Sequence, residues 1–283
     1  MPRKPRLGQN FLRDSQAIER IAAAVGECSG RTVIEIGPGR GAITRALAVR
    51  TRAARQSRLI AVELDPRLAE DLRIELLASA LVADPTLVSA IDAPVSVVQL
   101  SILDFDLESA AAASGASLLV VGNLPYYLTS EILLHLAAHH TVIDRAVLMV
   151  QREVADRITA EPGSRDYGLL SATLQLYGTV QRLFTLPPSA FSPPPDVYSS
   201  VVRWHFAPRF DALHVPEAEF IAFLRKCFAQ KRKTLANNLR HAEFPAEQIE
   251  SGFAASGVNA AARAETLSLE QFAALWLGLA QAE

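Results

Sequence analysis

The sequence has few cysteines and no long hydrophobic run, and each shortage excludes a class of protein. Cys28 and Cys227 are the two cysteines among 283 residues, which is too few for a disulfide framework and fits a reducing compartment. No apolar run approaches the ~18 residues of a membrane span. The basic N-terminus, MPRKPRLGQNFL, has no apolar signal core. We therefore expect a cytoplasmic protein with no membrane partner. The oligomeric state cannot be read from the sequence, and we take a monomer as the default.

Acidic residues are absent from three segments that hold most of the basic side chains. Residues 1–13, 40–58 and 225–240 contain 16 of the 28 lysines and arginines and none of the 30 acidic residues. The net charge of −2, taken globally, argues against a nucleic-acid partner. The segregation argues the opposite, because a polyanion-binding protein gathers its positive charge in this way. Solvated helix faces or tails are the alternative, and charge alone does not decide between them.

The first two thirds of the chain alternate short β-rich runs with helical patterns. Near-continuous apolar runs are typical of a parallel sheet covered on both faces, so we predict a doubly wound α/β sheet that binds its ligand at the carboxyl ends of the strands. The predicted strands are Thr32–Ile36, Leu59–Leu64, Val95–Leu100, Leu118–Val121 and Ala146–Gln151. The predicted helices are Ser15–Val25, Ala42–Val49, Pro66–Ala80 and Ser130–His139, with Asp14, Asp65 and Thr129 as N-caps.

The pattern changes after a proline-rich connector, Phe184–Asp196. Val197–Phe206 alternates as a strand does, and the chain from Glu217 onward has helical periodicity. We predict an α/β domain over residues 1–207 and a small all-α domain over residues 208–283. The helices predicted in the second domain are Glu219–Phe228, Lys231–Leu239, Ala246–Ala255 and Leu269–Ala280. Residues 78–94 have weak periodicity and are predicted to form a loop.

A glycine-rich turn, EIGPGRG at residues 35–41, follows the first predicted strand. Gly37 and Gly39 allow the backbone to approach a ligand closely. No Gly-Lys-Ser/Thr follows, which excludes a phosphate-binding P-loop, and the spacing is one residue short of G-x-G-x-x-G. Glu63, near the end of the next strand, can accept both hydrogen bonds of a ribose diol. The alternatives are a glycine turn without a ligand and a Glu63 that only caps the following helix. The two features together favour an adenosine-containing ligand, which could be either NAD or S-adenosylmethionine.

The fourth predicted strand leads into the tetrad Asn123-Leu124-Pro125-Tyr126. The exocyclic nitrogen of adenine is a poor nucleophile because its lone pair is delocalised into the ring. The side-chain oxygen of Asn123 and the carbonyl of Leu124 can accept its two hydrogens and favour a more tetrahedral nitrogen, which then points in line at a sulfonium methyl. Pro125 fixes the turn, and Tyr126 offers a face for an extruded base. A β-turn before a helix is the alternative, but the position after this sheet favours methyl transfer.

These motifs and several others resemble the KsgA/RsmA family of ribosomal RNA adenine dimethyltransferases. The resemblance runs over nearly the whole chain and does not depend on one motif. Besides the glycine turn and the tetrad, it rests on GQNFL (8–12), YGLLS (167–171), the segment 191–203, FAQKRKTLAN (228–237) and RAETLS (263–268).

The resemblance implies a Rossmann-like class I methyltransferase domain over residues 1–207 and a helical RNA-binding domain over residues 208–283. It implies that S-adenosylmethionine, without a metal, donates methyl groups to the N6 atoms of two adjacent adenines. These adenines would lie in a hairpin loop near the 3′ end of 16S ribosomal RNA, in a small-subunit assembly intermediate.

The resemblance also assigns residues to the site. The catalytic residues are Asn123, Leu124, Pro125, Tyr126 and Phe191, the last as a second aromatic against the target base. The cofactor-binding residues are Asn10, Leu12, Gly37, Gly39, Glu63, Ser101 and Asn123. Ser101 stands where the family usually has an acid, so we expect weaker cofactor binding there. The third basic segment, separately, predicts the RNA-binding residues, because such a cluster can neutralise phosphates: Arg225, Lys226, Lys231, Arg232, Lys233 and Arg240.

Three other functions stay open. An antibiotic-resistance methyltransferase acting on one large-subunit adenine shares the glycine turn and the tetrad, but does not usually carry a segment like Gln230–Asn237. A DNA adenine methyltransferase commonly begins its tetrad with Asp. An RNA-binding assembly factor with a vestigial cofactor site would not be an enzyme. Asp196–Tyr198 also departs from the family pattern, and the stretches Thr51–Arg58 and 78–94 look longer than usual. The first of these stretches is either an RNA contact or a solvated insertion, and we favour the insertion.

Overall fold

The computed structural model describes residues 10–83 and 95–280, and the chain divides into two compact units. The first unit contains the residues up to Ala155 together with Gln181–Phe206. The second contains Asp156–Val180 and the residues from Ala207 onward. The chain passes from the first unit to the second for the last time between Phe206 and Ala207, within one residue of the predicted boundary. Asp156–Val180, however, groups with the C-terminal helices. The division of labour between the two parts stays a prediction.

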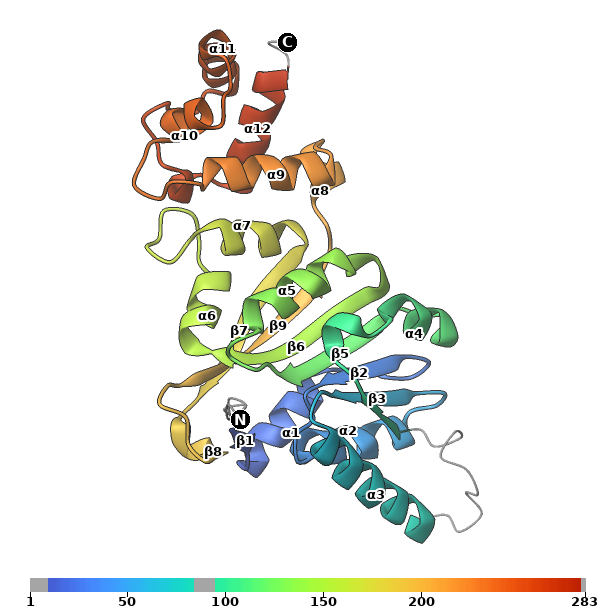
Figure 1. The fold of residues 1–283 in the computed structure, drawn as a ribbon. Helices are drawn as coiled ribbons and strands as arrows, with labels where there is room; N and C mark the ends of the chain where they lie inside the picture. Colours follow the sequence, from blue (N-terminus) through green and yellow to red (C-terminus); the bar gives the residue numbers. More distant parts are fainter. Residues whose placement is uncertain (1–9, 84–94, 281–283) are drawn as a thin grey trace, which may run out of the picture. The chain divides into compact units, whose positions relative to one another are not determined.

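A seven-stranded sheet carries the α/β part of the fold. Its strands are β2 (Thr32–Ile36), β3 (Arg58–Glu63), β4 (Val95–Gln99), β5 (Leu118–Asn123), β6 (Ile143–Gln151), β7 (Gly178–Leu186) and β9 (Ser199–Phe206). The order is β4-β3-β2-β5-β6-β9-β7 (Figure 1). The pairings among β2 to β6 are parallel, and β9 is antiparallel to β6. The order reverses between β2 and β5, the point at which open α/β sheets bind their ligands.

The five predicted parallel strands and the doubly wound Rossmann-like class are confirmed, whereas β7 was not predicted. β7 lies at the edge of the sheet, and most of its side chains are exposed or half-buried, so it has no near-continuous apolar run that would indicate a strand. Two short strands were also not predicted: β1 (Phe11–Leu12) pairs antiparallel with β8 (Phe191–Ser192). β8 lies inside the proline-rich connector, which therefore holds Phe11 and Leu12 in place.

The predicted helices of the first unit are present, with two further short ones. They are α1 (Ser15–Ala24), α2 (Ala42–Ala53), α3 (Pro66–Ala83), α4 (Leu107–Ser114) and α5 (Thr129–Ala138), with α6 (Arg152–Ile158) at the unit boundary. Asp14 and Asp65 cap α1 and α3 by accepting backbone hydrogen bonds, as predicted. The prediction for Thr129 is wrong, because this residue already belongs to α5 and its hydroxyl donates to the Pro125 carbonyl.

The helices α2 and α3 extend beyond their predicted ends. α2 continues to Ala53, and Thr51 is buried with its hydroxyl donating to the Leu47 carbonyl at 3.0 Å. The stretch Thr51–Arg58 therefore begins inside a packed helix, but most of its residues are exposed, and the choice between an RNA contact and a solvated insertion stays a prediction. α3 continues to Ala83, so the beginning of the loop predicted at 78–94 is helical. Residues 84–94 lie outside the described residues.

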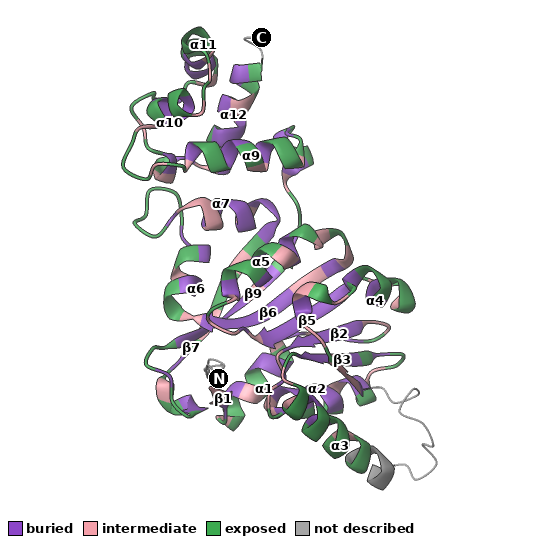
Figure 2. Cartoon of the chain, viewed as in Figure 1, coloured by how far each residue is buried: buried purple, intermediate pink, exposed green. Residues whose placement is uncertain are grey.

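The hydrophobic core lies on both faces of the sheet. Alternating strand residues such as Val121 and Val147 pack with Ile21 of α1 and Leu47 of α2. Residues of the opposite face, including Ile34, Val120 and Leu148, are buried as well, and α4 contacts β2 and β5 there. Figure 2 shows the central strands buried along most of their length. Burial on both faces explains why these strands read as continuous apolar runs.

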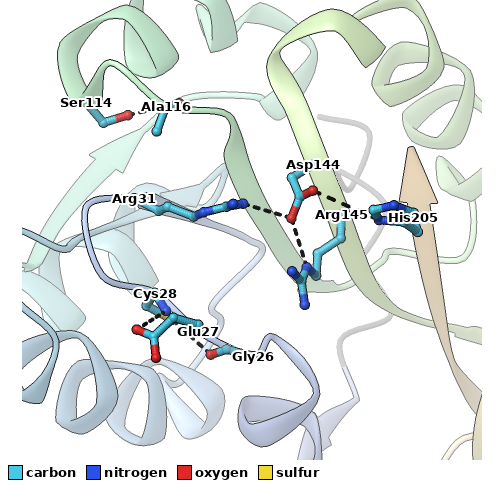
Figure 3. A network of polar contacts seen from close by, with 9 residues as sticks. All are labelled: Gly26, Glu27, Cys28, Arg31, Ser114, Ala116, Asp144, Arg145 and His205. Atoms are coloured by element: carbon cyan, nitrogen blue, oxygen red, sulfur yellow. Dashed lines mark hydrogen bonds and ion pairs between the residues drawn. The ribbon is translucent and has the colours of Figure 1, made fainter. Parts of the chain in front are cut away.

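An ionic cluster lies at the amino ends of the parallel strands, away from the edge where ligands bind. Asp144 Oδ2 contacts Arg31 Nη1 at 2.8 Å and Arg145 Nε at 3.0 Å, and His205 Nδ1 lies 4.0 Å from Oδ1 (Figure 3). Partial burial opposes ionisation of Asp144, but the two guanidinium groups outweigh it and lower the pKa of this carboxyl. The cluster ties β6 to the turn before β2.

The second unit is helical, as predicted for the C-terminal part. Its helices are α7 (Leu169–Leu176), α8 (Phe210–Leu213), α9 (Glu217–Cys227), α10 (Leu235–His241), α11 (Ala246–Ser256) and α12 (Leu269–Ala280). α10 begins at Leu235, not at Lys231 as predicted, because Thr234 caps it and the basic residues before it form a turn. Phe220, Phe223 and Trp276 form an aromatic cluster between α9 and α12. No helix within 10–83 and 95–280 is long and apolar enough to span a membrane.

Candidate active site

A cavity opens at the carboxyl ends of the parallel strands of the first unit. It collects segments that are far apart in the sequence: the N-terminal residues from Asn10, the glycine turn after β2, the end of β3, the turn after β4 and the tetrad after β5. The residues that line it and bear on function are Asn10, Phe11, Leu12, Glu35, Gly37, Gly39, Arg40, Glu63, Ser101, Asn123, Leu124, Pro125, Tyr126 and Tyr127. The structure therefore brings together every predicted catalytic or cofactor-binding residue except Phe191.

The glycine turn forms one wall of the cavity. Gly37 and Gly39 have φ angles of 63° and 56°, a region that residues with a side chain rarely adopt. A Cβ atom on Gly39 would lie 3.1 Å from the ring of Phe11, so the aromatic ring closes directly over the turn. The guanidinium carbon of Arg40 lies 4.5 Å from the centre of the same ring. Phe11 and Arg40 are thus cavity residues that the sequence prediction did not assign.

Glu63 is held in a fixed orientation at the end of β3. Its side chain is 6% exposed; Oε2 accepts a hydrogen bond from the Gly39 amide and Oε1 one from the Asp65 amide, both at 2.9 Å. A carboxylate oxygen has more than one lone pair, so each oxygen retains acceptor capacity. The acid that was predicted to hold a ribose diol is therefore oriented by the glycine turn itself.

Glu35 is a second carboxyl of the cavity, and it differs from Glu63 in its hydrogen bonding. It is 1% exposed, and its Oε2 has no hydrogen-bond partner among the described residues. Burial, with a smaller contribution from the nearby charge of Glu63, raises the pKa of Glu35 from 4.5 to about 8. The sequence reasoning treated Glu35 only as the first letter of the glycine motif. An acid inside an otherwise apolar strand was the signal that could have identified it.

The tetrad lies where β5 ends, and its backbone is anchored on both sides. Asn123 Nδ2 donates to the Asn10 carbonyl at 3.3 Å, which leaves Oδ1 as the side-chain acceptor for a ligand. The Leu124 amide donates to the Met149 carbonyl of β6 at 3.0 Å. The Pro125 carbonyl accepts from the Thr129 hydroxyl at 3.0 Å, and the Tyr126 hydroxyl lies 3.2 Å from Ser199 Oγ. These contacts hold the tetrad rigidly at the cavity.

Phe191 does not line the cavity. Its side chain is 1% exposed and belongs to the hydrophobic core beneath α1 and the sheet, while its backbone pairs with Leu12. A ring enclosed in this way is not available to a base in this conformation. What Phe191 does here is hold the N-terminal strand, and through it Asn10, against the site.

Ser101 lines the cavity as predicted, but its hydroxyl is engaged. Ser101 Oγ accepts from the Leu103 amide at 3.2 Å and caps a short 3₁₀ turn. Of the acids that follow, Asp104 lies in that turn and Asp106 caps α4 by accepting from the Ser109 amide at 2.8 Å. Neither lines the cavity, so neither replaces the acid that the family usually has at position 101.

The predicted RNA-binding residues are all exposed on the second unit. Arg225 and Lys226 lie at the end of α9, Lys231–Lys233 form the turn between α9 and α10, and Arg240 lies near the end of α10. Asn238, in the same part of the chain, is 1% exposed, and its side chain hydrogen-bonds to backbone groups instead of facing solvent.

The side chain of Asn238, in α10, binds the backbone of the residues that precede that basic turn. Its Nδ2 donates to the Cys227 carbonyl at 2.7 Å and to the Gln230 carbonyl at 3.3 Å, and its Oδ1 accepts from the Gln230 amide at 3.1 Å. These three bonds use most of the capacity of one amide side chain. The buried side chain of Asn238 therefore stabilises the conformation in which Lys231–Lys233 are exposed to solvent.

The other two basic segments differ in how far their charges are available. In the middle segment, Arg45 forms a two-pronged ion pair with Glu75, at 2.6 and 2.8 Å, and Arg50 donates to the Gly26 carbonyl. Arg52, Arg55 and Arg58 are exposed. Of the N-terminal segment, residues 1–9 lie outside the described residues.

The strand order and the placement of the cavity at its reversal point put this protein among the class I methyltransferases. Similar solved structures support this class. A dimethyladenosine transferase from Plasmodium falciparum has a TM-score of 0.75 at 21% identity, over 96% of this chain and 98% of that one. The 23S rRNA methyltransferase ErmE has a TM-score of 0.69 at 25% identity, and the match covers 96% of this chain and 100% of that one.

Sequence comparison narrows the class to a family. Residues 2–281 match the family model of ribosomal RNA adenine dimethylase. The ribosomal RNA small subunit methyltransferase A of Acidobacterium capsulatum is 55% identical over 273 residues, which cover 96% of this chain and 90% of the relative. The protein of the same name from Koribacter versatilis is 47% identical over 278 residues, with 97% and 93% covered. The chain belongs to the ribosomal RNA adenine dimethylase family, and the resemblance drawn from the motifs is confirmed.

Membership of a methyltransferase family implies S-adenosylmethionine as the methyl donor, and the cavity residues fit it. The buried Glu35 oxygen without a partner leaves a position for a hydrogen bond with a ligand, and Glu63 keeps acceptor capacity that suits a diol. Within the described ranges, no three His, Cys, Asp or Glu residues are grouped so that they could hold a metal ion.

Proposed function

We propose that this chain dimethylates the N6 atoms of two adjacent adenines in a hairpin loop near the 3′ end of 16S ribosomal RNA. The proposed substrate is a small-subunit assembly intermediate, and the reaction uses one S-adenosylmethionine molecule per methyl group. The extent of the match to relatives named small subunit methyltransferase A supports this choice over a large-subunit substrate. The proposed setting is the cytoplasm, and the proposed active form is a monomer.

The observation that carries the proposal is the orientation of Asn123 in the cavity. Because its amide nitrogen donates to the Asn10 carbonyl, its oxygen is the atom left to accept a hydrogen bond from a substrate. The Leu124 carbonyl is the second acceptor, on a residue whose own amide is tied to β6. Two acceptors on adjacent residues match the two hydrogens of one exocyclic amino group.

The residues of the chain perform the reaction by positioning. Asn123 and Leu124 accept the hydrogens of the adenine amino group and direct its lone pair, and Pro125 keeps their separation fixed. Tyr126, restrained by Ser199, offers a ring face to the extruded base. Glu63, the glycine turn and Asn10 are the residues that would hold S-adenosylmethionine, which supplies an electrophilic methyl group when it is bound. No dedicated base is needed, because the positively charged product nitrogen is strongly acidic.

Methyl transfer to small subunits tests the proposal directly. Purified protein is incubated with labelled S-adenosylmethionine and small subunits that lack the modification, and in parallel with mature large subunits and with DNA. We expect label in two adjacent adenines of the small subunit and none in the other substrates. Label in a large-subunit adenine would favour the activity for which ErmE is named, and no label with retained RNA binding would favour a non-enzymatic assembly factor.

A substitution in the tetrad tests the mechanism. Asn123→Ala removes the acceptor oxygen, and we expect turnover to fall at least about a hundredfold, the scale of losing one positioned transition-state contact, with RNA binding retained. Asn259→Ala, an exposed asparagine in the second unit, is the control and should behave as wild type. Wild-type turnover in Asn123→Ala would contradict the role given to the amide oxygen.

The basic turn of the second unit is proposed to dock on ribosomal RNA. Replacing Lys231, Arg232 and Lys233 with Ala should weaken small-subunit binding. The slope of log binding constant against log salt concentration should become shallower by about two, because three phosphate contacts are lost. Cofactor affinity should be unchanged. The triple variant of Arg52, Arg55 and Arg58 removes the same charge from the middle segment and serves as the comparison. Equal effects of the two triple variants would mean that only net charge matters.

A further inference from the structure

An exposed tyrosine and an exposed arginine contact each other where β6 ends and β9 begins, and they have no part in the chemistry proposed above. Tyr198 is 46% exposed, and the guanidinium carbon of Arg152 lies 5.1 Å from the centre of its ring. The Arg152 amide also donates to the Tyr198 carbonyl at 2.9 Å. The ring and the cation are therefore fixed relative to each other by a backbone contact as well as by their side chains.

The position of this pair follows from the strand ladder. Arg152 comes directly after β6 and Tyr198 directly before β9, and the neighbouring residues Gln151 and Ser199 face each other in the antiparallel ladder. Ser199 is buried, and its hydroxyl lies 3.2 Å from the hydroxyl of Tyr126, which lines the cavity. Tyr198 is thus the sequence neighbour of the residue that contacts Tyr126, the ring on which the target base is proposed to stack, and the pair itself does not line the cavity.

An exposed ring with a guanidinium at its face is a recognised type of RNA contact. Unpaired bases stack on aromatic rings and on arginine planes, and this stacking tolerates any base because every base has a π-face. The arginine adds a cation for the phosphate next to that base. A base that is pulled out of its stack leaves its neighbour without a partner on one side, so a second stacking surface close to the cavity compensates for that loss.

We propose that Tyr198 and Arg152 form a stacking platform for the nucleotide adjacent to the extruded adenine. The inference rests on the proposed function, which supplies the extruded base, and it adds the residues that hold the neighbouring nucleotide. The Tyr198–Arg152 platform acts on RNA binding, and cofactor binding is independent of it. It favours a substrate with at least two unpaired nucleotides in a row, as a loop with adjacent target adenines provides.

Fluorescence of the neighbouring base tests the platform without requiring methyl transfer. An RNA hairpin of the target-loop type carries 2-aminopurine next to the target adenine and is titrated with full-length protein, because stacking quenches this base. We expect strong quenching with wild type and with Tyr198→Phe, and little with Tyr198→Ala or with Tyr198→Leu, which keeps apolar bulk but lacks a ring. Small-subunit methylation should show a KM raised about tenfold in Tyr198→Ala, within the range known for loss of one base–aromatic contact, with kcat unchanged.

The controls separate the platform from folding, from charge and from the proposed function. Arg152→Ala should raise KM and flatten the salt dependence, whereas Arg58→Ala, an exposed arginine at the amino end of β3, should change neither. Equal quenching by Tyr198→Ala, Tyr198→Leu and wild type would overturn the platform. If both variants lose quenching but also lose cofactor affinity, Tyr198 is structural and the platform is likewise overturned. Quenching by a wild-type protein that transfers no methyl group would leave the platform standing and overturn the proposed function.

Discussion

The buried carboxyl of Glu35 makes the stability of this protein depend on pH in a direction that can be calculated. The pKa of Glu35 is about 8 in the folded chain and 4.5 ordinarily. Between these two values the folded state keeps a proton that the unfolded state has released. The stabilising effect of that bound proton is therefore complete below pH 4.5 and is lost as the pH rises toward 8.

The magnitude follows from the linkage relation. One proton difference changes the free energy of unfolding by about 1.4 kcal/mol per pH unit, so Glu35 alone removes about 2.7 kcal/mol between pH 5 and pH 7. Glu35→Gln keeps the shape of the side chain and removes the titration. We expect the difference in unfolding free energy between Glu35→Gln and wild type to shift in favour of the variant by about this amount over that interval.

Urea unfolding at pH 5, 6 and 7 measures this difference. The readout is the slope of the difference against pH, so any constant cost of burying the amide cancels. Glu131→Gln removes an exposed carboxylate from α5 and controls for the loss of one negative charge. Parallel pH dependence of wild type and Glu35→Gln would refute the reasoning, because it would mean that the carboxyl is already ionised in the folded chain at pH 5.

Three further predictions concern other parts of the molecule. Asp144→Asn should lower the free energy of unfolding by about 1–3 kcal/mol at pH 7, and the gap to wild type should close as the pH falls through the lowered pKa of Asp144, below 3.8; acid titrations followed by circular dichroism measure this. Gly122→Ala should destabilise by about 1–3 kcal/mol in urea, because the new Cβ would lie 2.7 Å from the Ile36 carbonyl oxygen, whereas Gly168→Ala meets no atom within 4 Å and serves as its control. Asn238→Ala should release the basic turn and weaken small-subunit binding in a filter assay while cofactor affinity stays at the wild-type value; unchanged binding would contradict the positioning role.

The sequence predicted those features that depend on local pattern. The parallel strands can be recognised in the sequence because both of their faces are buried, so a run such as Leu118–Val121 is apolar at every residue. The caps at Asp14 and Asp65 follow from side chains that reach backbone amides two or three residues away. The cavity could be assembled in advance because parallel strands end at one edge, which places Asn123 near Gly37 without knowledge of the intervening chain.

The features that depend on distant contacts could not be predicted in this way. Phe191 lies in a motif that suggested contact with the target base, but its side chain is buried. It belongs to β8, which pairs with β1, and a pairing between two strands of two residues each leaves no local pattern in the sequence. Asn238 looked like a polar surface residue, yet it is buried because the turn before α10 folds over it. The charge state of Glu35 arises from the surrounding core, which no local pattern reports.

The bond between Asn123 and the Asn10 carbonyl joins residues 113 positions apart, and the strand that holds Asn10 in place pairs with residues 191–192. During synthesis the beginning of the chain therefore leaves the ribosome long before its partners exist. The Asn123 amide therefore stays without this strand-supported contact until β8 has been made and has emerged. A growing chain therefore cannot form this part of the cavity before β8 has emerged, so the cavity is completed late in synthesis.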